Sequence, residues 1–318
     1  MRIDQPDPDE PDVRPAGRAD LGDRGDRGDR EADTGFQQQR WEAPTVSREE
    51  QVAAHARNRE AVEAASRAAA DRDAWAEAVP RLRADWAAHQ ERYPERGRAS
   101  PHTEADGSWT CGEHRRLDPE QNTEASKAHA DLADEAGRHI LPAMLRIEAA
   151  DPQRRLAGLE HMVKGEDRLK EKLADELFGK DKTVREALNE VPDAVRFTLC
   201  YDHGHYAEGV LADVDWLKAE GFELIKLKNL WLGNQYKGIN SQWRRAETGT
   251  RLEMQFHTPE SLEAKELTHE AYERLRRPEA ETSQIERDEL EDFQRRANAV
   301  VATPPRTDTI KDFPEKKR

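Results

Sequence analysis

The stretch "YKGINSQWRRAETGTRLEMQFHT", residues 236–258, predicts two short β-strands joined by a turn at Gly249. Successive side chains of a strand point to opposite faces, so the second strand has one apolar face and one polar face. The polar face carries Glu253, Gln255 and His257. A carboxylate directly after a segment rich in Lys and Arg indicates a site shared by a divalent cation and a phosphate group, because Mg²⁺ commonly uses one or two carboxylates plus substrate phosphates.

The segments around this hairpin predict an α+β domain. Strands are expected at residues 194–202 and 222–231, which have the β-branched, aromatic or alternating residues typical of sheets. Apolar residues at helical spacing predict helices at residues 125–150, with a break near Pro142, and at 152–163, 206–221 and 259–277. This order favours one mixed β-sheet flanked by helices.

Composition divides the chain into five parts. Residues 1–45, which include the repeat "GDRGDRGDR", lack the apolar content needed to fold and predict a disordered acidic leader. Residues 46–95 are rich in Ala, Glu and Arg and predict a helical segment, and residues 96–122 predict a linker. The folded domain is expected at residues 123–300, followed by a disordered tail at 301–318.

The overall balance of residues argues against several classes of protein. The 318 residues are 37% charged, with a formal net charge of −15, which disfavours a duplex-DNA partner. Two cysteines without partner spacing indicate a reducing compartment. No apolar run is long enough for a membrane span and no secretory signal is recognised, so we expect a cytoplasmic protein without a membrane partner. Secretion as an effector by a non-classical route stays open.

Cationic residues recur in two places near the predicted strands. Lys164, Arg168 and Lys172 are spaced four apart and share one face if their segment is helical. Lys226 and Lys228 share one face of a predicted strand. Either set fits a phosphate-binding wall, and either set also fits an ordinary solvated basic face.

An acidic and a basic residue, Asp193 and Arg196, lie where the first predicted strand begins. Asp is uncommon inside strands, so this position favours a metal or substrate role for Asp193. The alternative is an ordinary surface ion pair between the two side chains.

Together these segments resemble the RelA/SpoT-type nucleotide pyrophosphokinase domain over residues 125–280. "VKGEDRLKEKL" (163–173) resembles the basic ATP-binding segment of the family, and "PDAVRFTL" (192–199) resembles the strand that brings its metal-binding Asp. "KGINSQW" (237–243) resembles the Gly-Tyr-x-Ser-Leu-His acceptor loop, and "LEMQFHT" (252–258) resembles the Glu-Val-Gln-Ile-Arg-Thr strand. "AKELTHEAYE" (264–273) resembles the helix that closes the domain.

The resemblance implies a nucleotidyltransferase-like fold and an enzyme that transfers the β,γ-pyrophosphate of ATP to the 3′-hydroxyl of an acceptor nucleotide. It implies that Asp193 and Glu253 bind Mg²⁺ or Mn²⁺ and that both, with Arg196, are catalytic. The phosphate contacts that it implies are Lys164, Arg168, Lys172, Lys226, Lys228 and Lys237. The acceptor contacts that it implies are Ile239, Asn240, Ser241, Trp243, Gln255, His257 and His269.

The sequence departs from the family where the acceptor base is recognised. Ile239 stands in place of the loop Tyr, which stacks on guanine, and Trp243 stands in place of the loop His. This predicts a broad or adenine-tolerant acceptor preference, with GDP or GTP, ADP or ATP, and tRNA as candidates. Trp243 or Tyr236 would supply the replacement ring.

Two other functions fit the same sequence. One is a toxin or effector of this fold that acts on ATP, ADP or tRNA, which an acidic leader and a long helical segment would suit. The other is a non-catalytic protein whose helices at residues 47–93 bind a protein partner. Retention of both Asp193 and Glu253 argues against the second, because a binding module needs neither carboxylate.

Overall fold

This computed structural model describes residues 72–95, 99–112, 114–277 and 282–314. The chain divides into two units, residues 1–48 and 49–318, and every described residue belongs to the second. The predicted leader at residues 1–45 and the first part of the predicted helical segment, residues 46–71, lie outside the described residues. No helix among the described residues has the length and apolar character needed to cross a membrane.

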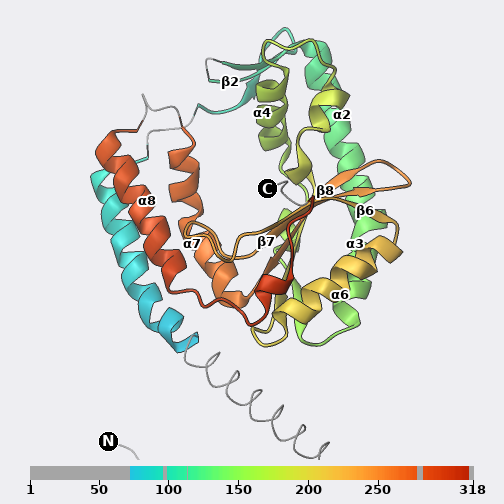
Figure 1. Cartoon of the computed structure of the whole chain (residues 1–318). Coiled ribbons are helices and arrows are strands. Elements are labelled where there is room, and N and C mark those ends of the chain that lie inside the picture. Colours follow the sequence, from blue (N-terminus) through green and yellow to red (C-terminus); the bar gives the residue numbers. More distant parts are fainter. Residues whose placement is uncertain (1–71, 96–98, 113, 278–281, 315–318) are drawn as a thin grey trace, which may run out of the picture. The chain divides into compact units, whose positions relative to one another are not determined.

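A five-stranded mixed sheet lies at the heart of the fold (Figure 1) and confirms the α+β prediction. Its strands follow the order β4-β5-β8-β7-β6, in which β5 and β8 are parallel and the other neighbours are antiparallel. The strands span Arg154–Ala157 (β4), Arg196–Tyr201 (β5), Phe222–Asn229 (β6), Ile239–Arg245 (β7) and Arg251–His257 (β8). The predicted hairpin is therefore present, and Gly249 occupies its turn at φ 76°, a left-handed conformation that suits glycine.

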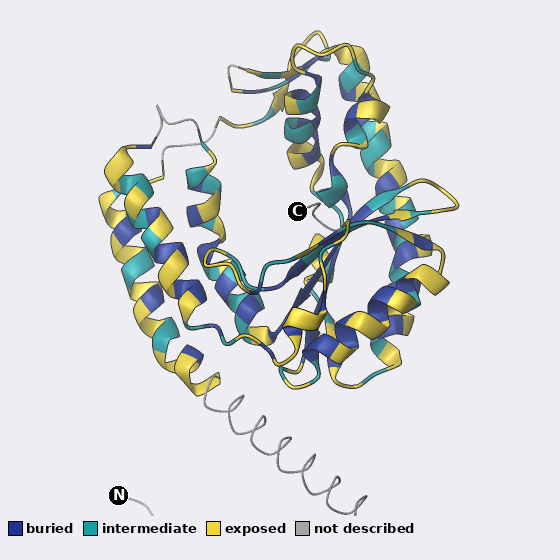
Figure 2. Ribbon diagram, in the orientation of Figure 1, coloured by how far each residue is buried: buried dark blue, intermediate teal, exposed yellow. Residues whose placement is uncertain are grey.

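The two faces of the sheet are packed differently. The helices α3 (Leu141–Ala149) and α6 (Tyr206–Ala219) cover one face of the sheet (Figure 1). On this face Tyr201 of β5 donates a hydrogen bond to Asp213 of α6. On the other face His257 contacts Ser261 of α7 (Pro259–Leu275). Figure 2 shows the strands largely buried between these helices.

A small antiparallel sheet replaces the linker that we expected at residues 96–122. Its strands are β1 (His102–Thr103), β2 (Trp109–Cys111) and β3 (Arg115–Leu117). Trp109, 1% exposed, donates its indole N–H to Asp167 of α4 (Glu166–Leu177), at 3.0 Å. Arg115 forms a bidentate pair with Asp175 on the same helix. The sequence did not predict this sheet, because strands of only two or three residues show no alternating pattern among the Gly and Ser residues around them.

The helix predicted at residues 152–163 is wrong, because β4 and a single 3-10 turn (η2, Leu159–His161) occupy this segment. Antiparallel pairing with β5 fixes the strand. The Arg154 side chain is buried, donates to the Ile147 carbonyl and pairs with Asp213. Tertiary pairing therefore overrides the helical tendency of "RRLAGLE".

The helix predicted before this strand is present. The segment at residues 125–150 divides into α2 (Pro119–Glu135), a π-helical turn η1 (Ala136–Ile140) and α3, so the break comes just before Pro142. A capping box between Asp118 and Gln121 begins α2. The short helix α5 (Val184–Leu188) and a 3-10 turn η3 (Pro192–Ala194) lead from α4 into β5.

The described part of the predicted helical segment is one helix, residues 72–92, and it packs within the domain. Trp75 and Arg83 donate hydrogen bonds to Glu263 of α7. Arg296 of α8 (Gln284–Ala299) pairs with Asp85. These contacts join the helix to α7 and α8.

Residues 301–314 differ from the disordered tail that we expected. Thr307–Thr309 form a 3-10 turn (η4), and Ile310 is 3% exposed. The Asn229 amide donates to the carbonyls of Thr307 and Ile310. Leu227 and Phe313 exchange two backbone hydrogen bonds, so the tail runs along β6.

Candidate active site

The parallel pairing of β5 and β8 brings the two predicted catalytic segments together. Arg196 lies opposite Glu253 in the register, and the Glu253 N–H donates to the Val195 carbonyl at 2.9 Å. Asp193 lies three residues before Arg196, in the turn η3 rather than on the strand. The turn delivers its carboxylate beside the end of β5 where Arg196 and Glu253 meet.

Two lysines hold the Asp193 carboxylate. Lys164 Nζ lies 3.0 Å and Lys172 Nζ lies 3.6 Å from Asp193 Oδ2. Burial by itself raises the pKa of Asp193, but Lys164, Lys172 and Arg196 outweigh it and leave the pKa below its ordinary value. Asp193 is therefore an ionised carboxylate within a cluster of cations.

The expectation that Lys164, Arg168 and Lys172 share a helix face requires correction. α4 begins at Glu166 with Gly165 as its N-cap, so Lys164 precedes the helix. Its backbone N–H instead bonds the Ala194 carbonyl beside β5. Lys164 and Lys172 nevertheless converge on Asp193, whereas Arg168 pairs with Glu171 at 2.8 Å.

Glu253 and Gln255 are neighbours on the polar face of β8. Glu253 is 8% exposed and Gln255 is 5% exposed. Gln255 Nε2 donates to Glu253 Oε1 at 2.5 Å. Gln255 Oε1 is buried without a hydrogen-bond partner among the described residues. An unsatisfied buried acceptor is unfavourable by roughly 1–3 kcal/mol, so this oxygen suits a hydrogen-bond donor from a ligand.

Cross-strand pairing extends this polar face over four strands. Residues paired directly across a sheet point to the same face. One row comprises Lys226, Gln242, Glu253 and Arg196, and the next comprises Lys228, Asn240, Gln255 and Thr198. The two strand lysines predicted to bind phosphate thus lie on the same face as Glu253, two strands away.

Alternation along β7 sends the other predicted acceptor residues to the opposite face. Ile239, Ser241 and Trp243 are all 0% exposed. The Trp243 indole donates to Ser241 Oγ at 2.8 Å, and Ser241 Oγ donates to the Met254 carbonyl. These three side chains belong to the hydrophobic core rather than to an acceptor surface, since they have no exposed atoms.

His257 is also enclosed rather than open to an acceptor. Tyr236 Oη lies 2.8 Å from His257 Nε2, and Ser261 Oγ lies 2.8 Å from His257 Nδ1. Burial, with Lys265 and Arg196 nearby, lowers the pKa of His257 to about 3, so the ring is neutral. A Cβ at Gly238, where φ is 147°, would come within 2.9 Å of this ring, which explains the glycine before Ile239.

Lys237, predicted to bind phosphate, is committed to the loop. Its ammonium donates to the Trp231 carbonyl at 2.7 Å, and burial lowers its pKa. Tyr236 is the aromatic ring of this loop that lies within electrostatic range of Glu253 and Arg196.

Lys265 of α7 is a residue of the site that the sequence patterns did not indicate. Burial, with Arg196 nearby, lowers the pKa of Lys265 to about 8, although Glu253 acts in the opposite direction. His269, one turn further along α7, lies within electrostatic range of Lys265, Arg196 and Arg168. The spacing of four between Lys265 and His269 was the available signal, but it also fits an exposed helix face.

The donor set fits a hard divalent cation only when a ligand contributes to it. Among the described residues, no three His, Cys, Asp or Glu side chains gather closely enough to hold a metal. Asp193 and Glu253 supply two carboxylates, and Mg²⁺ bound in this way takes further oxygens from phosphates and water.

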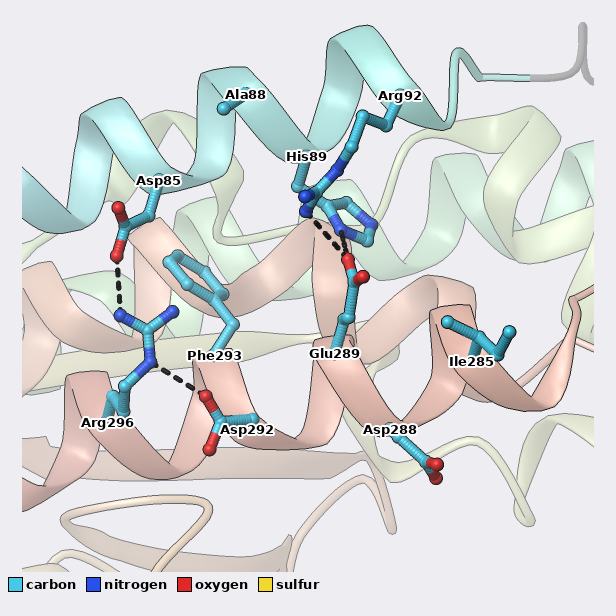
Figure 3. A pocket seen from close by; sticks show the side chains of 10 residues that line it. All are labelled: Asp85, Ala88, His89, Arg92, Ile285, Asp288, Glu289, Asp292, Phe293 and Arg296. Atoms are coloured by element: carbon cyan, nitrogen blue, oxygen red, sulfur yellow. Dashed lines mark hydrogen bonds and ion pairs between the residues drawn. The ribbon is translucent and has the colours of Figure 1, made fainter.

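A separate cavity lies between the helix of residues 72–92 and α8 (Figure 3). Arg296 pairs there with Asp85 and Asp292, and Arg92 pairs with Glu289. None of the predicted site residues lines this cavity. Two of these ion pairs, Arg296 with Asp85 and Arg92 with Glu289, bridge the helices, so we assign the cavity to the packing between them and not to the site.

No protein-family model matches the sequence, and no curated protein matches it. Among solved structures, a GTP pyrophosphokinase family protein from Streptococcus pneumoniae is 14% identical with a TM-score of 0.35, over 57% of this chain and 85% of its own. The protein smu.1046c from Streptococcus mutans UA159 is 13% identical with a TM-score of 0.34, over 57% of this chain and 88% of its own. The site is therefore interpreted from its own residues.

Proposed function

We propose that this protein is a transferase that moves the β,γ-pyrophosphoryl group of ATP to a hydroxyl group of an acceptor nucleotide. The observation that carries the proposal is the Glu253–Gln255 pair beside Arg196 and the Asp193 cluster. Gln255 Oε1 has no hydrogen-bond partner among the described residues, while Gln255 Nε2 orients Glu253. A ligand hydroxyl that donates to this pair would satisfy the orphaned oxygen and lie next to a carboxylate able to accept its proton.

The cations supply the second requirement of such a transfer. Phosphoryl-type transfer depends on positioning and on neutralising charge, with little covalent chemistry by the protein. Lys164, Lys172 and Arg196 surround Asp193 and form a basic cluster at the end of β5. A polyphosphate bound there would replace Asp193 as the partner of the two lysines.

Release of Asp193 from its lysines would leave it free, with Glu253, to hold Mg²⁺ or Mn²⁺. When bound, the ion would neutralise charge on the phosphate oxygens. The residues of the chain then have separate roles: the lysines and Arg196 bind phosphate, and Glu253 receives the proton of the acceptor hydroxyl.

The bond changes in the proposed reaction balance without a further reagent. The acceptor oxygen forms a bond to the β-phosphorus of ATP, and the bond between that phosphorus and the α,β-bridging oxygen breaks. AMP leaves with the bridging oxygen, and the acceptor gains a pyrophosphate. The proton of the hydroxyl passes to Glu253, which later releases it to water.

The acceptor base has fewer candidate contacts than the sequence predicted. Trp243 is in the core, so Tyr236 is the ring we propose for stacking. Asn240 and Gln242 lie on the polar face and offer amide groups to a base or ribose. We retain the prediction of a broad or adenine-tolerant acceptor preference.

The test is formation of AMP and of a pyrophosphorylated acceptor from ATP labelled at the β- and γ-phosphates. GDP, GTP, ADP, ATP and deacylated tRNA should be compared at equal concentration with Mg²⁺. Glu253→Gln and Asp193→Asn are each expected to lower transfer at least about a hundredfold, comparable to the contribution of a general base. Glu247→Gln, in the exposed β7–β8 turn, is the matched control and should behave as wild type.

Either of two results would refute the proposal. One is the absence of AMP formation with every acceptor. The other is full transfer by both carboxamide variants, because neither carboxylate would then take part. Strong selectivity for GDP or GTP would leave the reaction intact and contradict the expected acceptor preference.

A further inference from the structure

Lys265 differs from Lys164, Lys172 and Lys237 in having no hydrogen-bond or ion-pair partner among the residues that the structure describes. Lys164 and Lys172 pair with Asp193, and Lys237 bonds a carbonyl. The half-buried Lys265 side chain forms no hydrogen bond or ion pair with any residue that the structure describes. Partial burial of an ammonium without a partner is unfavourable, so structural stability does not account for this lysine.

The position of Lys265 follows from the anchoring of α7. Thr258 caps the helix and Ser261, in its first turn, bonds His257 at the end of β8. Lys265 comes one turn after Ser261 and shares its face of the helix. That face is directed to the polar side of the sheet, where Glu253 and His257 lie on β8.

Charged and titratable groups from three elements surround the ammonium. The groups within electrostatic range are Arg196 and Cys200 of β5, Glu253 and His257 of β8, and Glu266 and His269 of α7. Arg196 is a cation, and Glu253 already accepts from Gln255. Lys265 thus adds a positive charge to the polar face of the sheet from the α7 side, within electrostatic range of Arg196 and Glu253.

We propose that Lys265 binds a phosphate group of the substrate from the α7 side of the site. The bound group is the polyphosphate of a nucleotide, and this identity rests on the proposed function. The presence of an anion-binding lysine at this place rests only on the cluster of groups described above. Lys164, Lys172 and Arg196 would bind other oxygens of the same polyphosphate.

Protonation of Lys265 then controls anion binding near neutral pH. With a pKa of about 8, the free side chain is ~90% charged at pH 7 and ~10% charged at pH 9. Only the charged form attracts an anion, so affinity through this group should fall by up to about tenfold across that interval. Arginine at the same position stays charged throughout.

The test measures binding of inorganic pyrophosphate by calorimetry at pH 7 and pH 9, at constant ionic strength and without turnover. Wild type is compared with Lys265→Arg, so that ionisation of the ligand itself cancels in the ratio of dissociation constants. We expect the dissociation constant of wild type, divided by that of Lys265→Arg, to rise about tenfold between pH 7 and pH 9. Lys265→Met should bind about tenfold or more weakly than wild type at pH 7.

Lys218→Arg is the matched control, since Lys218 is exposed on α6 and pairs with Asp215. Its ratio to wild type should be the same at both pH values. A constant ratio for Lys265→Arg, or no binding of pyrophosphate by wild type, overturns the inference. If Lys265→Met does not fold, the ratio of dissociation constants between wild type and Lys265→Arg still tests the inference. Binding that follows the expected pattern without AMP formation supports the anion site and refutes the proposed reaction.

Discussion

At the scale of single residues, the candidate site combines groups that sequence spacing could identify with groups that it could not. Asp193 stood out because Asp is uncommon inside strands, and Arg196 follows it where the first predicted strand begins. Glu253 stood out because it lies on the polar face of a predicted strand, directly after a segment rich in Lys and Arg. Lys265 did not, because a single lysine among the many glutamates of α7 is also typical of a solvated helix face, and local spacing does not indicate which face meets β8. The roles of Gly238 and His257 also depend on a contact between two strands.

The neutral, buried His257 leads to a pH prediction. Its pKa in the folded protein, about 3, lies below the ordinary value of 6.5, so the folded state binds fewer protons between these values. The neutral His257 ring therefore contributes stability to the folded state that is fully present above pH 6.5 and is lost as pH falls toward 3. From pH 7 to pH 5, the free energy of unfolding should fall by about 2 kcal/mol through this residue.

Urea unfolding at the two pH values checks this expectation. His257→Gln should lose the contribution, so its pH dependence should be smaller than that of wild type by the same amount. His161→Gln, which alters an exposed side chain, should retain the wild-type dependence. Equal pH dependence in wild type and His257→Gln would show that His257 does not titrate as the structure implies.

At the scale of elements, alternation and helical spacing predicted strands β5 to β8 and helices α6 and α7. The failures have physical causes. β4 has only four residues and two of them are arginines, so only its pairing with β5 makes it a strand. Lys164 is spaced four residues before Arg168, which suggested that both lie on one helix. The helix begins only at Glu166, after the N-cap Gly165, so Lys164 lies outside it. Side chains alternate between the two faces along β7, so Asn240 lies on the polar face and its neighbour Ile239 lies on the apolar face.

This assignment of the β7 faces can be tested with two neighbouring substitutions. Trp243→Ala should lower the free energy of unfolding by about 3–5 kcal/mol, because it removes a fully buried ring. Gln242→Ala should change stability little and should weaken binding of the acceptor nucleotide. Chemical denaturation and acceptor titration distinguish the two. A stable Trp243→Ala variant with altered acceptor selectivity would return Trp243 to the site.

At the scale of the whole domain, the sequence underestimated how much of the chain takes part in folding. Residues 99–117 and 301–314 were expected to be linker and tail because they are rich in Gly, Pro and charged residues. A few apolar or aromatic side chains, such as Trp109 and Ile310, anchor them. Such isolated anchors carry no periodicity, so they become visible only when the surface that receives them is known.

The anchored tail predicts that a single substitution far from the site is destabilising. Ile310→Ala should lower the free energy of unfolding by about 2–4 kcal/mol, the usual result of removing a buried Ile side chain. Lys311→Ala, at the next and exposed position, should stay within about 0.5 kcal/mol of wild type. Denaturant titration of both variants measures the difference, and equal stabilities would favour the disordered tail.

The pairing of Leu227 with Phe313 also bears on how the molecule behaves among other copies of itself. β6 is the last strand of the five-stranded sheet, and the open hydrogen-bonding groups of such a strand are a template for pairing with another chain. The tail occupies the backbone of Leu227, and Asp312 accepts a hydrogen bond from the Asn229 N–H. Residues 312–313 therefore block part of this edge from pairing with a strand of another molecule, in addition to stabilising the domain.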